Sequence, residues 1–466
     1  MKIRIRIGRV GLIAAVAALF SSCTTLEPDR KNMVAAQTPE QFVGHSGTNA
    51  VQTHWWTSFH STQLNRLMDK AFANNLTLEQ AAARLDQAEA SARKSGAAGK
   101  IQLDAKASAS STHYMPDGAN HSTTAASSAG LYASYELDLW GRLKSTEKAA
   151  LATWTASKFD LQTAAMSLSA ELANRYFTWL AQSETLSLYE SQLESSRKKL
   201  SALELRYKTG QATTLDLLQQ RQQVAAAEAK LPPVRALINA SVNEIAVLTG
   251  QIPGTDLHLV PEALPALPPQ PTAGLPVVLL ENRPDVQATR LDLESADWTV
   301  GAARAARLPT VSLSGSVYSS DEKIDDLFDD WASNLAASMI APLLDGGSRK
   351  AEVDRTLAVS REKIAAYRLA VLEAIQEVED ALSDEMQQTD YVEALGRQHT
   401  AAQKSETESI NRYQRGILPY IDTLTAIVAR ESLEMTCLQA HADLLADRIQ
   451  LYRSLGGDWT FILEEK

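Results

Sequence analysis

The chain has 466 residues, 45% of them hydrophobic and 22% charged, a composition that fits a folded protein and excludes a disordered one. This length allows two or three domains, or a single body built by duplication. The formal net charge of −11 argues against a nucleic-acid partner, because proteins that bind nucleic acid present a basic face.

Residues 1–22 have the pattern of an export signal. A positively charged start precedes the apolar stretch Val10–Phe20, which is too short to cross a bilayer as a helix. Phe20-Ser21-Ser22-Cys23 resembles a bacterial lipoprotein cleavage box, which implies lipidation of Cys23 with acyl chains such as palmitate. An ordinary signal with a chance cysteine is the alternative. No later segment is apolar enough for a transmembrane helix.

Cysteine and histidine show no pattern that indicates a site. With only two cysteines, Cys23 and Cys437, neither a disulfide framework nor a four-ligand zinc site can form. The histidines have no metal-ligand spacing, and no Walker loop, dinucleotide fingerprint or His-Glu-x-x-His motif occurs. We therefore expect no enzyme activity, no metal and no cofactor.

A first module is expected over 78–252, after an N-terminal segment over 23–77. It begins with a helix over Leu78–Ala98, which is rich in alanine. Alternation of apolar and polar residues then predicts two strands, over about 101–114 and 129–140. The polar loop Met115–Ser128 lies between them.

Two long helices complete the module. From Leu143 to Tyr207 there is neither Pro nor Gly, which predicts one helix of about 95–100 Å. Apolar residues recur in it every seven positions, which indicates packing against neighbouring helices. Pro232-Pro233 should kink or break the helix that returns.

A proline-rich linker over 253–283 leads to a second module over 284–458, and 459–466 form a C-terminal tail. The second module is expected to contain strands over about 309–319 and 333–344 and an unbroken helix over Arg349–Leu395. Its residues repeat those of the first: Arg84-Leu85-Asp86 recurs as Arg290-Leu291-Asp292, an offset of 206 positions. The expected fold is mainly α with a small transmembrane β part, built from a duplicated helix–strand–strand–long helix–long helix module.

The strands have the length that crosses a bilayer when tilted, about 9–11 residues. A membrane tolerates no open sheet edge, because an unpaired backbone group in hydrocarbon costs several kcal/mol, and the smallest transmembrane barrels have about eight strands. Four strands per chain therefore require several chains to share one barrel. Two soluble hairpins that cap a coiled coil are the alternative.

Several motifs, each weak alone, follow one another in an informative order. They are His54-Trp55-Trp56-Thr57-Ser58-Phe59, Asn75-Leu76 with Ala81, Ala82 and Arg84, Arg283-Pro284-Asp285-Val286, Ala306-Arg307-Leu308-Pro309 and Leu455-Gly456-Gly457. On the duplicated modules, they resemble the TolC-like outer membrane factors of bacterial efflux systems, in the NodT-type lipoprotein branch. The resemblance covers essentially the whole mature chain.

The resemblance implies a homotrimer in the bacterial outer membrane. Its twelve strands would form a β-barrel, and its helices would continue the barrel as an α-helical tunnel through the periplasm. The closed tip of the tunnel would meet a periplasmic adaptor, which couples it to an inner-membrane pump of the resistance–nodulation–division kind. Residues 23–77 would contribute to the lipid anchor and the equatorial region.

The inner end of the tunnel should lie where each long helix turns back. The residues concerned are Arg206, Tyr207, Gly210 and Asp216 in the first copy and Arg412, Tyr413, Gly416 and Asp422 in the second. Helix capping and the helix dipole explain the glycines and arginines without any gate. The functional hypothesis is that Arg412, Tyr413 and Asp422, three times around an axis, hold the tube shut, while the first-copy residues face the adaptor.

The loop Ser319–Asp330 is strongly acidic. Its carboxylates are Asp321, Glu322, Asp325, Asp326, Asp329 and Asp330. They form either a solvated loop or a rim that attracts cations at the exit.

The favoured function is a passive exit duct for drugs or other small molecules in a tripartite efflux pump. The outer membrane channel of a protein-secretion system shares this architecture and remains an alternative. A periplasmic coiled-coil adaptor or scaffold is an alternative of another class, and it predicts a single helical hairpin rather than a duplicated module.

Overall fold

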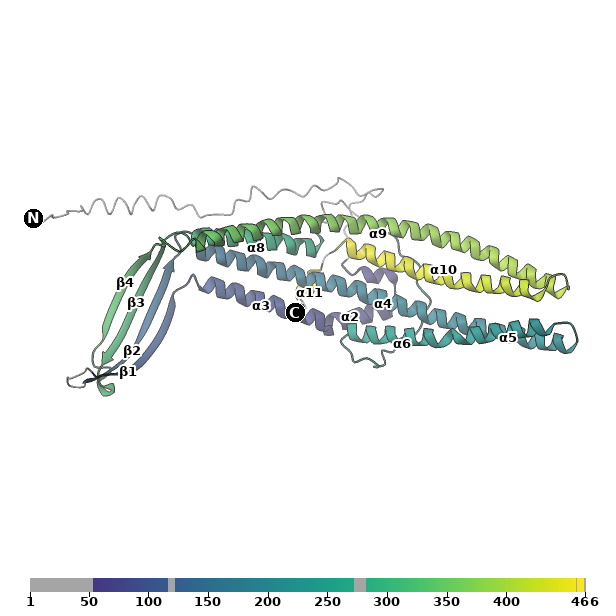
Figure 1. Cartoon of the computed structure of the whole chain (residues 1–466), viewed down its shortest axis with the longest axis horizontal. Coiled ribbons are helices and arrows are strands. Elements are labelled where there is room, and N and C mark those ends of the chain that lie inside the picture. Colours follow the sequence, from purple (N-terminus) through teal and green to yellow (C-terminus); the bar gives the residue numbers. More distant parts are fainter. Residues whose placement is uncertain (1–52, 116–121, 272–281, 458, 465–466) are drawn as a thin grey trace, which may run out of the picture. The chain divides into compact units, whose positions relative to one another are not determined.

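The computed structural model describes residues 53–115, 122–271, 282–457 and 459–464. They form a mainly helical protein with one four-stranded sheet (Figure 1). The chain divides into two compact units. The first contains the described parts of 84–158 and 288–369, and the second contains those of 37–83, 159–287 and 370–466.

The two modules have the same order of elements. The first contains α3 (Leu76–Ala97), β1 (Gln102–Tyr114), β2 (Ser122–Leu137), α4 (Arg142–Lys208), α5 (Thr214–Ala229) and α6 (Leu231–Leu248). The second contains α8 (Pro284–Ala305), β3 (Thr310–Asp321), η3 (Ile324–Asp326), β4 (Ala332–Ile340), α9 (Ser348–Gln414) and α10 (Tyr420–Ser454). The short helices η2 (Trp55–Phe59) and α2 (Thr62–Asn74) precede them, and α11 (Phe461–Glu464) follows.

The helices largely follow the sequence pattern. The chain breaks between α5 and α6 at Lys230, and the Pro232-Pro233 pair lies in the first turn of α6, where a missing N–H costs nothing. The unbroken stretch expected over Arg349–Leu395 lies within α9, which continues through Gly396 to Gln414 and has 67 residues, as α4 has. A single glycine costs a helix only about 1 kcal/mol, which packing over so long a helix offsets.

The limits of β2 and β4 also differ from the sequence expectation. Residues Ser122–Ser128, expected in a loop, belong to β2 and pair with the end of β1. β4 ends at Ile340, short of the expected residue 344, because Pro342 cannot donate to a ladder. None of the helices in the described part of the chain is both long and apolar enough to span a membrane.

The sheet is antiparallel throughout, in the order β1-β2-β3-β4 (Figure 1). One row of directly opposed residues is Leu103, Ala133, Gly315 and Leu335, and the next is Asp104, Tyr132, Ser316 and Asn334. Because successive residues of a strand point to opposite faces, one face of the sheet is apolar and the other is polar. Among the described residues, the outer edges of β1 and β4 have no strand partner.

An aromatic cluster anchors the N-terminal segment within the second unit. Trp55 of η2 is 1% exposed and stacks on Tyr452 of α10, with ring centroids 5.1 Å apart. Phe59 contacts Phe177 of α4, and Trp56 stacks on Trp459 after α10. The expected His54–Phe59 motif is therefore a packing element that joins both modules.

Arg283 begins the motif Arg283-Pro284-Asp285-Val286, which opens α8, and it also has a structural role. Its guanidinium lies 2.6 Å from Asp285 and 2.7 Å from Glu377 of α9. It also donates a hydrogen bond to the carbonyl of Ser454, at the C-terminus of α10. The cation therefore satisfies a helix end that would otherwise leave carbonyl groups buried without donors.

A second buried arginine links α10, α9 and the linker. Arg448 is 2% exposed, and its Nε and Nη2 lie 2.6 Å and 2.8 Å from the two carboxylate oxygens of Glu385. Its remaining nitrogen donates to the carbonyl of Pro268. The pair fixes the axial register of α9 against α10.

Burial, together with the negative charges of Asp384, Asp443 and Glu385, raises the pKa of Asp447 to about 6. Because the folded protein holds this proton more tightly than the unfolded chain, stability falls as pH rises from about 4 to about 6. We expect Asp447→Asn to be close to the wild type at pH 4, the lower end of that window, and to have the higher melting temperature at pH 7.5. Thermal unfolding of both proteins at pH 4 and pH 7.5 measures this, and an equal shift at both pH values would contradict it.

Candidate functional site at the helical turns

The two helical turns share one backbone geometry. Gly210 and Gly416 have φ of +73° and +76°. Gln211 N–H donates to the Arg206 carbonyl at 2.8 Å, and Ile417 N–H donates to the Arg412 carbonyl at 3.0 Å. A Cβ on either glycine would meet no atom within 4 Å, so the positive φ alone requires glycine.

The turns bring together Arg206 and Tyr413, two of the predicted residues. The Arg206 guanidinium lies 4.7 Å from the centre of the Tyr413 ring, a cation–π contact between the first and second copies. Tyr413 in turn contacts the ring of Tyr420 at 5.3 Å. Burial raises the pKa of Tyr413. The positive charge of Arg206 opposes this rise, and the negative charge of Asp216 adds to it.

The other predicted residues make local contacts within their own hairpin. Arg412 pairs with Glu408 of its own helix at 2.7 Å, and both side chains are exposed. Asp216 closes a capping box with Thr213 at the start of α5. Tyr207 accepts a hydrogen bond from Thr214, and Asp422 is exposed in the first turn of α10. In one chain, the structure therefore brings Arg206 to Tyr413, whereas Arg412 pairs with Glu408 of its own helix and Asp422 is exposed.

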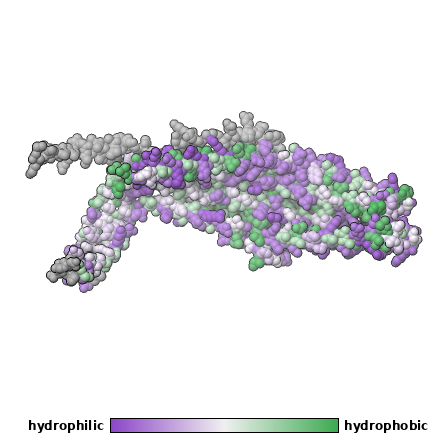
Figure 2. All heavy atoms as spheres, viewed as in Figure 1, coloured by the Kyte–Doolittle hydropathy of each residue, from purple (hydrophilic) through white to green (hydrophobic). Residues whose placement is uncertain are grey.

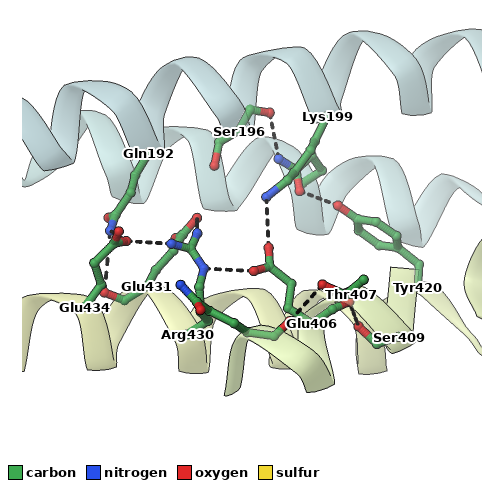
Figure 3. A network of polar contacts seen from close by, with 12 residues as sticks. Gln192, Ser196, Lys199, Glu406, Thr407, Ser409, Tyr420, Arg430, Glu431 and Glu434 are labelled. Carbon is green, nitrogen blue, oxygen red and sulfur yellow. Dashed lines mark hydrogen bonds and ion pairs between the residues drawn. The ribbon is translucent and has the colours of Figure 1, made fainter. Parts of the chain in front are cut away.

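A network of charges, one of them buried and the others half-buried, lies farther from the turns and was not predicted. This charged network consists of Lys199 of α4, Glu406 of α9, and Arg430, Glu431 and Glu434 of α10 (Figure 3). Arg430 Nε lies 2.8 Å from Glu406 Oε2, and Lys199 Nζ lies 4.0 Å from Glu406 Oε1. Glu431 is 4% exposed. The network joins the hairpin of the first copy to that of the second.

Burial has opposite effects on the two ends of this network. It raises the pKa of Glu431. The cations Lys199, Arg430 and Lys230 oppose this rise, and the carboxylate of Glu406 adds to it. Burial lowers the pKa of Lys199. The carboxylates of Glu431 and Glu406 oppose this fall, and the positive charge of Arg430 adds to it. Each charge is therefore maintained by its partners rather than by water, so the contact is strong only while all of them remain together.

A chain of neutral hydrogen bonds runs beside the charged network (Figure 3). The Tyr420 hydroxyl donates to Gln220 Oε1, and Gln220 Nε2 donates to the Ser196 carbonyl at 2.8 Å. Gln220 is fully buried. These three residues connect α10, α5 and α4. The only signal for them in the sequence was polar residues at positions that face other helices.

Apolar residues are exposed around the same turns (Figure 2). They are Leu205, Leu215, Leu218, Ile417 and Ile421, each at least 45% exposed. Exposed apolar residues that gather on one surface indicate a contact with another protein.

The remaining predicted sites lie elsewhere. Asp321 ends β3, and Asp325 and Asp326 lie in η3; all six acidic residues of the loop are exposed or half-buried. Cys23 and residues 116–121 of the first loop lie outside the described residues.

The comparisons with known proteins agree with this geometry. The family described as outer membrane efflux protein matches residues 67–251 and 275–457. The pyoverdine export outer membrane protein OpmQ of Pseudomonas aeruginosa is 31% identical over 97% of both chains. The toluene efflux pump outer membrane protein TtgI of Pseudomonas putida is 30% identical over 86% of this chain and 87% of its own length. The solved outer-membrane channel OprN superposes with a TM-score of 0.87 at 27% identity, over 94% of this chain and 100% of that one.

The resemblance found in the sequence is thus confirmed, and so is the mainly helical, TolC-like fold with a small strand part. The location in the bacterial outer membrane follows from the same matches. The chain belongs to the outer membrane efflux protein family and serves as the outer membrane exit duct of an efflux pump.

Proposed function

We propose that three copies of the chain form one duct, whose barrel wall contains twelve strands. The observation that carries this proposal is the four-stranded sheet with two open edges and one apolar face. Since β1 and β4 run in opposite directions, β4 of one copy can pair antiparallel with β1 of the next. Two copies would give eight strands, a barrel whose interior side chains fill it, so three is the smallest number that leaves a passage.

The duct is passive in this proposal, and the chain performs no chemistry. An inner-membrane pump of the resistance–nodulation–division kind supplies the energy, and a periplasmic adaptor joins the two. The exposed apolar residues around the helical turns support this partner, because they offer the adaptor a surface to bury (Figure 2). We also propose that acyl chains on Cys23 anchor the N-terminal segment to the membrane.

We assign the parts of the chain accordingly. Residues 1–22 are the signal, 23–77 the lipidated and equatorial segment, 78–252 and 284–458 the two efflux repeats, 253–283 the linker and 459–466 the tail. The acidic loop between β3 and β4 would form a rim at the exit that attracts cations. The cargo would be small organic molecules, since the relatives include exporters named for pyoverdine and toluene.

The gate in this proposal has two levels at the helical end. At the turns, Arg206, Tyr207, Gly210 and Asp216 face the adaptor. Arg412, Tyr413 and Asp422, beside the turn at Gly416, form a latch that holds the tube shut around the axis. Above them, the charged network holds the two hairpins of each chain together. Opening separates the two hairpins and exposes the charges of the network to water. The closed and open states are two discrete packings of the helices.

The test is the conductance of the purified full-length protein in planar bilayers. We expect stepwise conductance from the trimeric fraction alone. Leu335→Arg, on the apolar face of β4, should abolish insertion, because a cation facing lipid at mid-membrane costs about 2–4 kcal/mol per copy. Ala336→Arg is the matched control: it places the same charge one residue along β4, on the polar face, and should still insert.

Equal insertion by both variants would contradict the assignment of the apolar face to lipid. Trimers that never conduct would contradict the duct itself.

A further inference from the structure

The polar face of the sheet carries an aromatic and charged cluster that the gate does not use. Tyr132 of β2 and Tyr318 of β3 have near-parallel rings, 15° apart in orientation, with centroids separated by 6.4 Å. The Lys106 ammonium of β1 lies 5.0 Å from the centre of the Tyr132 ring. Asp104 is directly opposite Tyr132 in the register.

The backbone is adapted to this cluster at Gly130. Gly130 is the partner of both Lys106 and Tyr318, and it lies on the same face as they do. A Cβ at this position would lie 2.4 Å from the Tyr318 Cβ and 2.6 Å from its Cα. Because glycine has no side chain, the large side chains of Lys106 and Tyr318 on the neighbouring strands have room beside it.

A depression of about 250 Å³ lies beside this cluster and opens on the sheet. Its lining combines one aromatic ring with both signs of charge and with hydroxyl and amide groups. The lining residues include Asp104, Lys106, Tyr132, Ser134, Ser316 and Asn334. They come from all four strands, so the sheet itself builds the depression.

We propose that this depression binds planar aromatic zwitterions on their way through the barrel. The inference rests on the proposed function, in which three chains close a barrel with its polar face inward. A planar ring would stack on Tyr132, as aromatic pairs do. A carboxylate would lie near Lys106, and an ammonium group near Asp104.

The charges favour a zwitterion over a simple ion. Asp104 and Lys106 are two residues apart on one strand, so their Cα atoms lie about 6–7 Å apart and both side chains leave the same face. A ligand with only one charge would gain one contact and meet repulsion from the other residue. A ligand with both charges gains both contacts, and three copies of the site surround the passage.

L-tryptophan and L-leucine are suitable probes, because they have the same two charges and differ in the aromatic ring. In planar bilayers with the full-length protein, millimolar L-tryptophan should cause brief current reductions that L-leucine does not cause. Tyr132→Leu should shorten the dwell time of these events about 3- to 10-fold, because one aromatic contact has roughly that effect. Lys106→Gln should shorten it as well, while Tyr114→Leu, at the far end of β1, should leave it unchanged.

The outcomes separate this inference from the function on which it rests. Normal conductance with equal effects of the two amino acids would overturn the binding site and leave the duct intact. Equal dwell times in wild type and Tyr132→Leu would do the same, because tyrosines that only fill the barrel wall would give that result. A complete lack of conductance would overturn the duct and the site together.

Discussion

Arg448→Ala is expected to lower the free energy of unfolding by about 3–5 kcal/mol, the usual effect of removing one partner from a buried ion pair. Arg448 and Glu385 are 2% and 4% exposed, so the variant leaves a carboxylate that water cannot reach. It also removes the donor to the Pro268 carbonyl. Chemical unfolding of the detergent-solubilised protein measures the change.

Arg397→Ala is the matched control for this prediction. Arg397 also pairs with a glutamate, Glu393, but both side chains are about 70% exposed, so the loss should be no more than about 0.5 kcal/mol. The double variant Arg448→Met with Glu385→Leu should recover most of the stability, because it removes both charges. Equal losses for Arg448→Ala and Arg397→Ala would show that the buried pair does not hold α9 against α10.

The second large effect is expected on gating. Arg430→Met leaves Glu406, Glu431 and Glu434 with Lys199 as the only cation of the charged network. In the closed packing these carboxylates lose their cation, so the variant destabilises the closed state by several kcal/mol relative to the wild type. In the open packing water hydrates them, so the open state is destabilised little. A differential loss of about 3 kcal/mol changes the ratio of open to closed channels by more than 100-fold. Single-channel recordings should therefore show a much larger open probability.

The triple variant of Arg412, Tyr413 and Asp422 to alanine separates the two levels of the gate. If the latch at the turns contributes, this variant also opens the channel. If it leaves the conductance unchanged while Arg430→Met opens the channel, the latch is ruled out and the charged network alone holds the closed state. Unchanged conductance in both variants would exclude the helical end as the gate.

Local patterns in the sequence predicted the parts of the fold that depend on local chemistry. The absence of Pro and Gly predicted α4 to within one residue at each end. The repeated glycines predicted two helix ends with positive φ, and Gly210 and Gly416 have it. These features depend on backbone geometry and capping, which neighbouring residues determine.

The parts that the sequence did not reveal depend on contacts across long separations. Lys199 and Glu406 are on different helices, as are Glu385 and Arg448, and such pairs form only when the helices have one particular rotation and register. The start of β2 shows the same limit. Its first residues are small and polar, without a strand pattern, and pairing with β1 makes them a strand.

Disulfide cross-linking between the open edges tests the central claim most directly. Ala105→Cys in β1 is combined in turn with Ser333→Cys, Leu335→Cys and Ala337→Cys in β4, which all lie on the same face, in a Cys437→Ser background. If sister copies close the barrel, at least one combination oxidises to covalent dimers and trimers, with nothing larger, on a denaturing gel. Monomers alone in all three combinations, or a ladder that continues past three, would contradict a wall built from three chains.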